Sequence, residues 1–273
     1  MKEADIIIFD VAFGDAIYIK IKEDNNVKHS ILIDSGYAKH AKKYLSYLSK
    51  EGLGIDYLVI THKHTDHFAG VKTILEDPNF SIQGIITRID DKNNWSESYK
   101  KLNDFLVKEK FPVYDIFSEK AGEILEDFEI LYPFSGVRKP VSDNQNQNSI
   151  VLALHLQDGY FMLMGDATVK EESLLLAKKQ IIFENVYGVK IGHHGSETST
   201  GTEFIRALQT ADNLEKYGFV SCNNSNNPPP HEKIKREWLP HVLEYTEIET
   251  TKNSIRVHFC GDALTGVEPF VIQ

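Results

Sequence analysis

The residues with the clearest capacity for chemistry lie between positions 61 and 70, where the chain reads Thr-His-Lys-His-Thr-Asp-His-Phe-Ala-Gly. Four metal-ligand side chains fall within six positions of this segment: His62, His64, Asp66 and His67. The apolar run 57–60 comes directly before it and is typical of a buried strand. A strand that ends in such a cluster directs nitrogen and oxygen donors into one pocket, and these donors suit zinc, manganese or iron. The spacing therefore predicts a metal site.

Two later apolar runs also end in metal-ligand residues. Residues 161–164 are followed by Gly165 and Asp166, and residues 189–191 by the segment Gly-His-His-Gly-Ser, which contains His193 and His194. Paired histidines directly after a buried strand indicate a functional site. As a single residue, Asp166 could instead belong to the start of the helix that follows it. Together with the first cluster, these runs predict a two-metal site assembled from three strand ends.

The rest of the chain must supply the elements that position these ends. Short apolar runs separated by turn residues predict strands at 5–10, 16–22, 30–34, 57–61, 84–87, 128–132, 149–156, 160–164, 186–191, 219–222 and 254–259. Apolar stripes at helical spacing predict helices at 41–48, 95–106, 168–176, 204–208 and 234–238. The aromatic residues in these stripes, Trp95 and Trp238 among them, are expected to be core residues. This α/β pattern predicts two mixed β-sheets sandwiched between helices.

Composition and charge limit the classes of function. The chain has 273 residues, 41% apolar and 26% charged, which is ordinary for a globular enzyme, and we treat 1–273 as a single domain. No apolar stretch approaches the ~20 residues that span a bilayer. A net charge of −10 argues against a broad basic surface for duplex DNA, although it leaves a phosphoester substrate open. Cys222 and Cys260 lack metal or redox spacing and are expected to be reduced thiols, as in a cytoplasmic protein.

Six segments, taken in order, resemble the metallo-β-lactamase-fold hydrolases. The nearest likeness is to the hydrolase domain of bacterial competence DNA-uptake channels (the ComEC type) and its stand-alone soluble relatives. The segments are DVAFGDA at 10–16, LIDSG at 32–36, the decapeptide at 61–70, NQNSIVL at 146–152, MGD at 164–166 and KIGHHGS at 190–196. The resemblance covers nearly the whole chain and implies an αββα four-layer sandwich, with two divalent ions, Zn²⁺ or Mn²⁺, at one edge between the sheets.

The resemblance also implies a ligand set. His62 and His64 would hold the first ion, Asp66 and His67 the second, and Asp166 would bridge the two. His194 is expected to complete the second site, because it aligns with the single histidine of the superfamily's Gly-His-Gly pattern. His193 would then face substrate or support the ligands, and Asp34 would orient the metal loop from outside the ligand set.

The chain departs from the family pattern at two places near the site. The wider superfamily supplies another histidine to the first ion from the segment before the Gly-Asp strand, but residues 144–149 contain none. The first site is therefore expected to keep an open or water-filled position and to be the less fully occupied. Relatives often show Gly-His-Pro-His-Pro after the Asn-rich loop, where this chain has Pro-Pro-Pro-His ending at His231. His231 could be a general acid or a phosphate contact, or a capping residue at the surface.

These features predict a metal-dependent hydrolase of the phosphodiesterase or nuclease type, which uses a metal-bridged hydroxide as the nucleophile. The predicted catalytic residues are Asp66, His193 and His231, and the predicted substrate contacts are Asn148, Ser149 and Ser196. Asn148 could equally be a turn-forming residue. The substrate would be DNA or a small phosphoester. Two alternatives remain: a thioester or lactone hydrolase on the same scaffold, or a metal-binding module within a multi-protein defence or DNA-processing system. The sequence identifies no protein partner.

Overall fold

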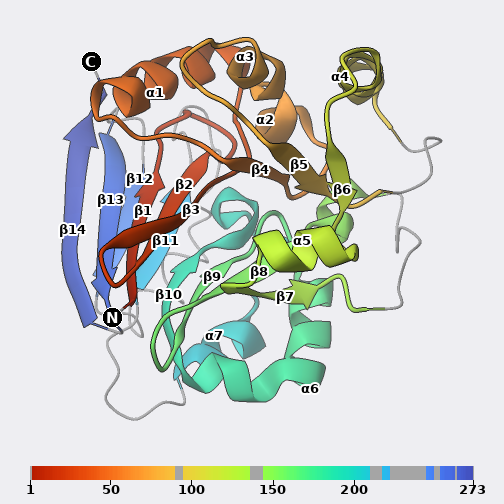
Figure 1. The fold of residues 1–273 in the computed structure, drawn as a ribbon. Coiled ribbons are helices and arrows are strands. Elements are labelled where there is room, and N and C mark those ends of the chain that lie inside the picture. The colour runs from red at the N-terminus through yellow and green to blue at the C-terminus, as the bar shows by residue number, and fades with distance from the viewer. Residues whose placement is uncertain are drawn as a thin grey trace.

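Two β-sheets pack face to face between layers of helices (Figure 1). This computed structural model describes residues 2–89, 95–135, 144–209, 217–221, 244–248, 253–261 and 263–272. The first sheet has eight strands in the order β14-β13-β1-β2-β3-β4-β5-β6, and the second has six in the order β12-β11-β10-β9-β8-β7. Both sheets are mixed, because each joins antiparallel strands to parallel ones. The predicted four-layer sandwich is confirmed.

The strands of the first sheet are β1 (Lys2–Ile8), β2 (Ile17–Glu23), β3 (Asn26–Ile33), β4 (Tyr57–Ile60), β5 (Gly84–Thr87), β6 (Val113–Asp115), β13 (Asn253–Cys260) and β14 (Ala263–Val271). Those of the second are β7 (Phe128–Tyr132), β8 (Val151–His155), β9 (Tyr160–Leu163), β10 (Val186–Lys190), β11 (Tyr217–Ser221) and β12 (Glu244–Ile248). Strands β3 to β6 run parallel, as do β9 to β12.

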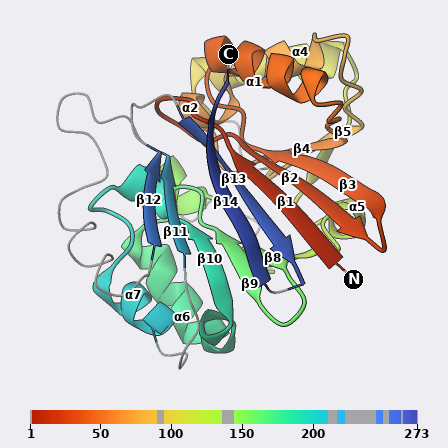
Figure 2. The same ribbon diagram turned by 90° about the vertical axis from the view of Figure 1, so that its left-hand side faces the viewer.

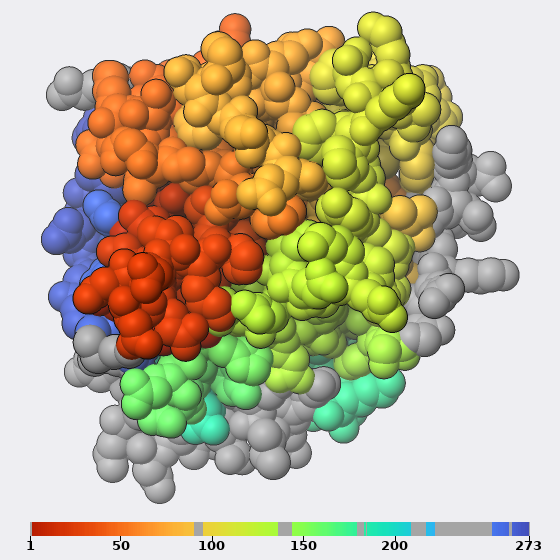
Figure 3. Space-filling model, viewed as in Figure 1, coloured from red at the N-terminus to blue at the C-terminus, as the bar shows by residue number. Residues whose placement is uncertain are grey.

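Helices cover the outer face of each sheet. The first sheet carries α1 (Ala38–Lys50), α2 (Thr65–Phe68), α3 (Val71–Leu75) and α4 (Glu97–Lys108); the second carries α6 (Val169–Glu184) and α7 (Thr202–Gln209). Helix α5 (Glu119–Ile124) lies at the end of the inter-sheet layer, where its apolar side chains join the core. Figure 3 shows the orange residues of the first helical layer closing the upper face of the molecule. No helix in the described ranges is long and apolar enough to cross a membrane.

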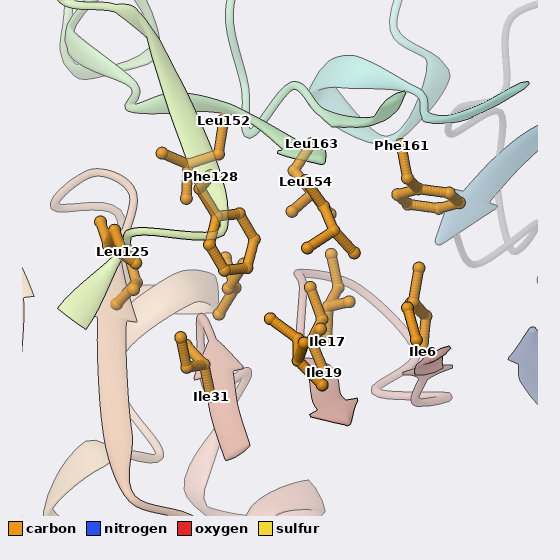
Figure 4. Close-up of a cluster of buried hydrophobic side chains, with 14 of the residues drawn as sticks. Ile6, Ile17, Ile19, Ile31, Leu125, Phe128, Leu152, Leu154, Phe161 and Leu163 are labelled. Carbon is orange, nitrogen blue, oxygen red and sulfur yellow. The ribbon is translucent and has the colours of Figure 1, made fainter. Parts of the chain in front are cut away.

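The core between the sheets consists of aliphatic and aromatic side chains from alternate strand positions (Figure 4). Ile19 of β2 faces Leu154 of β8, and Ile6 of β1 faces Phe161 of β9; all four are fully buried. Each such side chain contributes roughly 1.5–3 kcal/mol when it leaves water. The inter-sheet core therefore holds the two sheets in a fixed relation, and with them the strand ends that carry the candidate ligands.

The sequence analysis did not predict three of the strands. Strand β6 has only three half-buried residues, and β12 carries a polar pattern. Strand β14 contains Gly266 and Pro269, which argue against a strand unless it lies at an edge of its sheet, as this one does. Helix α4 begins at Glu97, because the Ser96 hydroxyl accepts a hydrogen bond from the Tyr99 amide, so Trp95 precedes the helix. The predicted helix at 234–238, with Trp238, lies outside the described residues, as do Cys222 and His231.

Helix α6 is tied to the start of α7 by a buried carboxylate. Thr168 and Glu171 have the spacing of a capping box, and the Glu171 carboxylate accepts hydrogen bonds from the Thr168 amide and hydroxyl. The next residue, Glu172, is 2% exposed and accepts hydrogen bonds from the amides of Thr200 (2.5 Å) and Gly201 (2.8 Å). Burial raises the pKa of Glu172 to about 7, and these two amides oppose the rise.

This pKa predicts a component of stability that falls as pH rises. The unfolded chain releases the Glu172 proton near pH 4.5, whereas the folded protein keeps it until about pH 7. Between these values the folded state binds more protons, so raising the pH favours unfolding, by roughly 3 kcal/mol in total. Urea unfolding at pH 5 and pH 8 should show a smaller loss of stability in Glu172→Gln than in the unmodified protein. The exposed Glu51→Gln should behave like the unmodified protein, and an identical loss in all three proteins would contradict the assignment.

Candidate metal centre

Four strand ends meet at one edge of the sandwich. In the first sheet, β3 and β4 run parallel and lead into Asp34 and the 61–67 segment; in the second, β9 and β10 run parallel and lead into Asp166 and the His193–His194 pair. Because parallel strands end at the same edge of a sheet, all these side chains emerge together. The Ile150 amide donates a hydrogen bond of 2.9 Å to the Thr61 carbonyl and so joins the two sheets beside the site.

The Asp166 carboxylate lies at the middle of the cluster. Its Oδ1 is 3.4 Å from His67 Nε2 and 3.6 Å from His194 Nε2. Its Oδ2 is 3.5 Å from His62 Nε2 and 3.9 Å from His193 Nε2. Two pairs of imidazole nitrogens therefore approach the two oxygens of one carboxylate.

Asp66 belongs to the Oδ1 side of the cluster. Its Oδ2 is 3.6 Å from His194 Nε2 and 3.9 Å from His67 Nε2, and the three ligand atoms lie within 4.8 Å of one another. With Asp166, this side offers two nitrogens and two carboxylates, the donor set expected for the second ion. His194, and not His193, belongs to this group of ligand atoms.

On the Oδ2 side of Asp166, fewer of the candidate ligand atoms lie close together. His62 and Asp166 again fall within a group of ligand atoms 4.8 Å apart or closer, together with His67, but His64 and His193 belong to no such group among the described residues. The His64 ring lies 4.8 Å from the His62 ring, centre to centre. His193 is held by two polar contacts, from its Nδ1 to Thr198 Oγ1 (2.7 Å) and from its Nε2 to Asn146 Nδ2 (3.1 Å).

An unusual backbone conformation turns both histidines of the pair toward Asp166. His193 (φ 46°, ψ 44°) and His194 (φ 52°, ψ 26°) are consecutive residues in the left-handed region. That conformation is costly for residues with a Cβ and persists only where its surroundings enforce it. Here the His193 amide donates to the Gly165 carbonyl (2.9 Å), and the Ser199 hydroxyl donates to the Gly192 carbonyl (2.7 Å). Strain of this kind is typical of functional sites.

The charge states of the cluster suit cation binding. Burial lowers the pKa of His62, His64 and His193, so their imidazoles are neutral near pH 7. Although burial alone would favour protonation of the carboxyls, the neighbouring histidines hold the pKa of Asp66 and Asp166 below the usual range. Burial disfavours the charged form of His67 as well, but Asp166 and Asp34 raise its pKa well above the ordinary value. Neutral imidazole and ionised carboxylate are the forms that bind a metal, so an ion at this position would displace the proton of His67.

Four buried polar atoms at the centre have no hydrogen-bond partner: Nε2 of His62, His67 and His194, and Oδ1 of Asp166. Leaving such atoms unsatisfied costs about 1–3 kcal/mol each, so a native structure retains them only for a reason. The His67 and His194 nitrogens lie 3.4 and 3.6 Å from Asp166 Oδ1, and the His62 nitrogen lies 3.5 Å from Asp166 Oδ2. These distances are too long for good hydrogen bonds but suit a cation between the atoms. The residues present therefore fit a metal centre.

Two carboxylates behind the ligands orient them. The Asp34 carboxylate accepts hydrogen bonds from His67 Nδ1 (2.6 Å), the Thr61 amide (2.8 Å) and the Thr61 hydroxyl (2.6 Å). Asp15 Oδ1 lies 3.6 Å from His194 Nδ1, and the Asp15 carboxylate is paired with the fully buried Lys190 ammonium at 2.8 Å. The sequence interpretation identified Asp34 but assigned no role to Asp15 or Lys190. Asp15 lies in the 10–16 motif, which the sequence analysis singled out. In the structure this turn packs directly against the metal loop, since a Cβ on Gly14 (φ 105°) would lie 2.1 Å from the Asp66 carbonyl oxygen.

The predicted substrate contacts lie in different environments. Ser149 is fully buried, and its Oγ accepts a hydrogen bond from the Asp166 amide (3.1 Å), a placement that favours positioning of Asp166 over contact with a substrate. Ser196 is half-buried, with its hydroxyl 3.1 Å from that of Thr198. Asn148 is buried, and its Oδ1 accepts from Nη1 of Arg88 at 3.5 Å. Arg88 itself was not identified from the sequence.

Comparisons with known proteins bear on the fold and the family. A family model described as the metallo-beta-lactamase superfamily matches residues 10–212. ComE operon protein 3 of Bacillus subtilis (strain 168) is 22% identical over 265 residues, which cover 88% of this chain and 31% of that protein. Recombination protein 2 of Haemophilus influenzae is 28% identical over 229 residues, which cover 81% of this chain and 24% of that protein. The chain thus spans about a third or less of the length of these curated relatives.

Among solved structures, Igni18, a metallo hydrolase from the hyperthermophilic archaeon Ignicoccus hospitalis, is similar in fold. It shares 13% sequence identity with a TM-score of 0.50, and the match covers 94% of this chain and 99% of that one. Together these matches confirm the resemblance on which the expected fold was based.

The contact between Asp34 and His67 predicts that metal affinity depends on a residue outside the ligand set. Asp34 has a left-handed backbone (φ 58°) that asparagine also tolerates, so Asp34→Asn should keep the fold while it weakens the acceptor for His67. Removing such a partner typically costs about 10–100-fold in metal affinity. A competition titration with a chromogenic chelator would measure this loss. Asp104→Asn, on the exposed face of α4, is the matched control, and equal affinity in the two variants would show that Asp34 does not support the site.

Proposed function

Because the chain belongs to the metallo-β-lactamase superfamily of metal-dependent hydrolases, we propose that it cleaves phosphodiester bonds with a pair of divalent metal ions. The observation that carries the binuclear part of this proposal is the placement of Asp166. One of its carboxylate oxygens is approached by His67 and His194, and the other by His62 and His193. A carboxylate approached from both sides in this way is suited to bridge two cations.

The proposed ligand set assigns a side of Asp166 to each histidine. His67, His194 and Asp66 would hold the second ion, and His62, His64 and His193 the first. His193 would thus supply the third nitrogen that segment 144–149 lacks, instead of acting as a general acid. Its contact with Thr198 supports this role, because donation from Nδ1 to the hydroxyl leaves the lone pair on Nε2, where an ion would replace the present partner, the Asn146 side-chain amide at 3.1 Å. Nitrogen-rich donors with carboxylates suit Zn²⁺ or Mn²⁺.

Bound ions would supply Lewis acidity and an activated water. The residues around the ions determine which class of substrate can bind there. The buried Arg88 guanidinium lines a small cavity together with His62 and Asn148. A fixed cation beside the ligands favours a substrate that carries negative charge at the reacting group. A phosphodiester meets this condition, whereas a neutral thioester or lactone does not. His231 remains the proposed proton donor to the leaving group.

Two further points belong to the proposal. We treat residues 1–273 as one hydrolase unit that acts in the cytoplasm. The H. influenzae relative is named recombination protein 2, and this name supports the inclusion of DNA among the substrates to test.

The activity can be tested on purified protein supplied with Mn²⁺ or Zn²⁺. We expect turnover of bis(p-nitrophenyl) phosphate or linear single-stranded DNA, and a loss of at least about 10³-fold in Asp66→Ala and Asp166→Ala, because each change removes a ligand. A glutathione thioester serves as the competing substrate. Turnover of the thioester alone would overturn the phosphodiesterase assignment. Absence of both metal and activity would favour a binding module.

The assignment of His193 predicts an effect on metal content. The unmodified protein should bind two ions per chain, and His193→Ala should lose the first ion while it keeps the second, since the Asp66 side is unchanged. Elemental analysis after dialysis measures the ratio directly. His29→Ala, in β3 and outside the cluster, is the control and should keep both ions. Two tightly held ions in His193→Ala would exclude His193 as a ligand.

A further inference from the structure

A cavity of about 410 Å³ opens beside the metal centre, between the end of β5 and helix α4. Its wall includes the aromatic side chains of Trp95, Tyr99 and Phe111, and its polar lining includes Asn103 and Lys110. The volume lies within the range of about 300–1,000 Å³ that is typical of small-molecule sites.

The rim of the cavity is unusually apolar. Ile89 is 51% exposed and Val107 is 67% exposed, and both line this cavity. They belong to a set of only six large hydrophobic side chains that are exposed among the described residues. Since exposed apolar residues that gather at one opening mark binding sites more often than isolated ones do, the mouth of the cavity is suited to a ligand with an apolar face.

The inner end of the cavity leads toward the metal centre through Arg88. This residue and Thr87 line both the large cavity and the small one that also contains His62 and Asn148. The small cavity has a volume of about 10 Å³, roughly the room for one water molecule. Arg88 is 3% exposed and donates to Asn148 Oδ1 at 3.5 Å. Arg88 therefore lies between the large cavity and His62, a proposed ligand of the first ion.

A second basic side chain lies near this inner end. Lys63, which is 4% exposed, has its Nζ 5.1 Å from the centre of the Trp95 ring and 5.4 Å from that of Tyr99. Burial, with a further contribution from Arg88, lowers the pKa of Lys63 to about 7, whereas the Asp115 carboxylate opposes this shift. The Arg88 guanidinium is therefore the main positive charge next to the aromatic wall, and the two together suit a ligand that combines an anionic group with a flat apolar one.

We infer that this cavity binds one nucleotide unit of the substrate, with the base against the aromatic wall and the phosphate against the Arg88 guanidinium at the inner end of the cavity. The inference rests on the proposed function and specifies its substrate class. Asn103 and Lys110 carry polar groups that can bond the edge of a base. Contact between a base and aromatic side chains contributes about 1–3 kcal/mol, whichever base is present.

Binding measurements can test this inference separately from turnover. Isothermal titration of the metal-loaded protein with adenosine 5′-monophosphate, adenosine and inorganic phosphate should rank the monophosphate at least about tenfold tighter than phosphate, because only the monophosphate fills both parts of the site. Equal affinities for the monophosphate and phosphate would overturn the inference.

Two variants probe the two ends of the cavity. Val107→Glu places a negative charge at the exposed rim and should weaken binding of the monophosphate several-fold without changing that of phosphate. Val27→Glu, at an exposed valine of β3 that does not line the cavity, is the matched control. Arg88→Met should weaken binding of both anions, and circular dichroism would verify that this buried change preserves the fold. Unchanged monophosphate affinity in Val107→Glu, or in a folded Arg88→Met, would contradict the site.

The outcomes also distinguish the two proposals. Monophosphate binding that depends on Val107 and Arg88, in a protein that cleaves no phosphodiester, would refute the proposed function and support the nucleotide site. Phosphodiester cleavage without any preference for the monophosphate over phosphate would support the proposed function and refute the nucleotide site.

Discussion

The position of one buried carboxylate organises the candidate site. Asp166 follows β9 directly, and its amide is held by the Ser149 hydroxyl, so its two oxygens cannot move far from the strand end. An ionised group at 2% exposure is tolerated only where opposite charge or hydrogen bonds compensate for lost hydration. The histidines on both sides of the carboxylate provide this compensation in part, and a cation would complete it. The strained His193–His194 backbone and the Asp34 contact to His67 both serve to keep imidazoles near these two oxygens.

Much of the fold and the ligand cluster could be predicted from the sequence, because the relevant signals are local. The 61–67 motif contains four donors in six positions, and an apolar run before it identifies the strand that carries it. The same holds for Asp166 and for the His193–His194 pair. Strand ends were predictable because hydrophobic periodicity stops where the ligands begin.

What the sequence could not show depends on contacts between distant segments. The allocation of His193 and His194 to different oxygens follows from a left-handed backbone at both histidines, which residue types alone do not indicate. Lys63 meets Trp95 and Tyr99, more than 30 positions away, only because α4 packs beside the metal loop. Lys190 and Asp15 are 175 positions apart, yet they form an ion pair that is buried between the sheets. Strand β14 was not predicted because it contains a glycine and a proline, which a strand tolerates only at the edge of a sheet.

The pairing of β1 with β13 has a consequence for the order in which the site is built during synthesis. Strand β1 begins at Lys2, but its neighbours in the sheet are β2 and β13, and β13 spans Asn253–Cys260 (Figure 2). On the ribosome, every proposed ligand between positions 62 and 194 emerges before β13 does. One edge of β1 therefore stays unpaired until residues 253–260 have left the exit tunnel, and an exposed edge of that kind invites pairing with other chains. All the proposed ligands are thus synthesised before the first sheet can close.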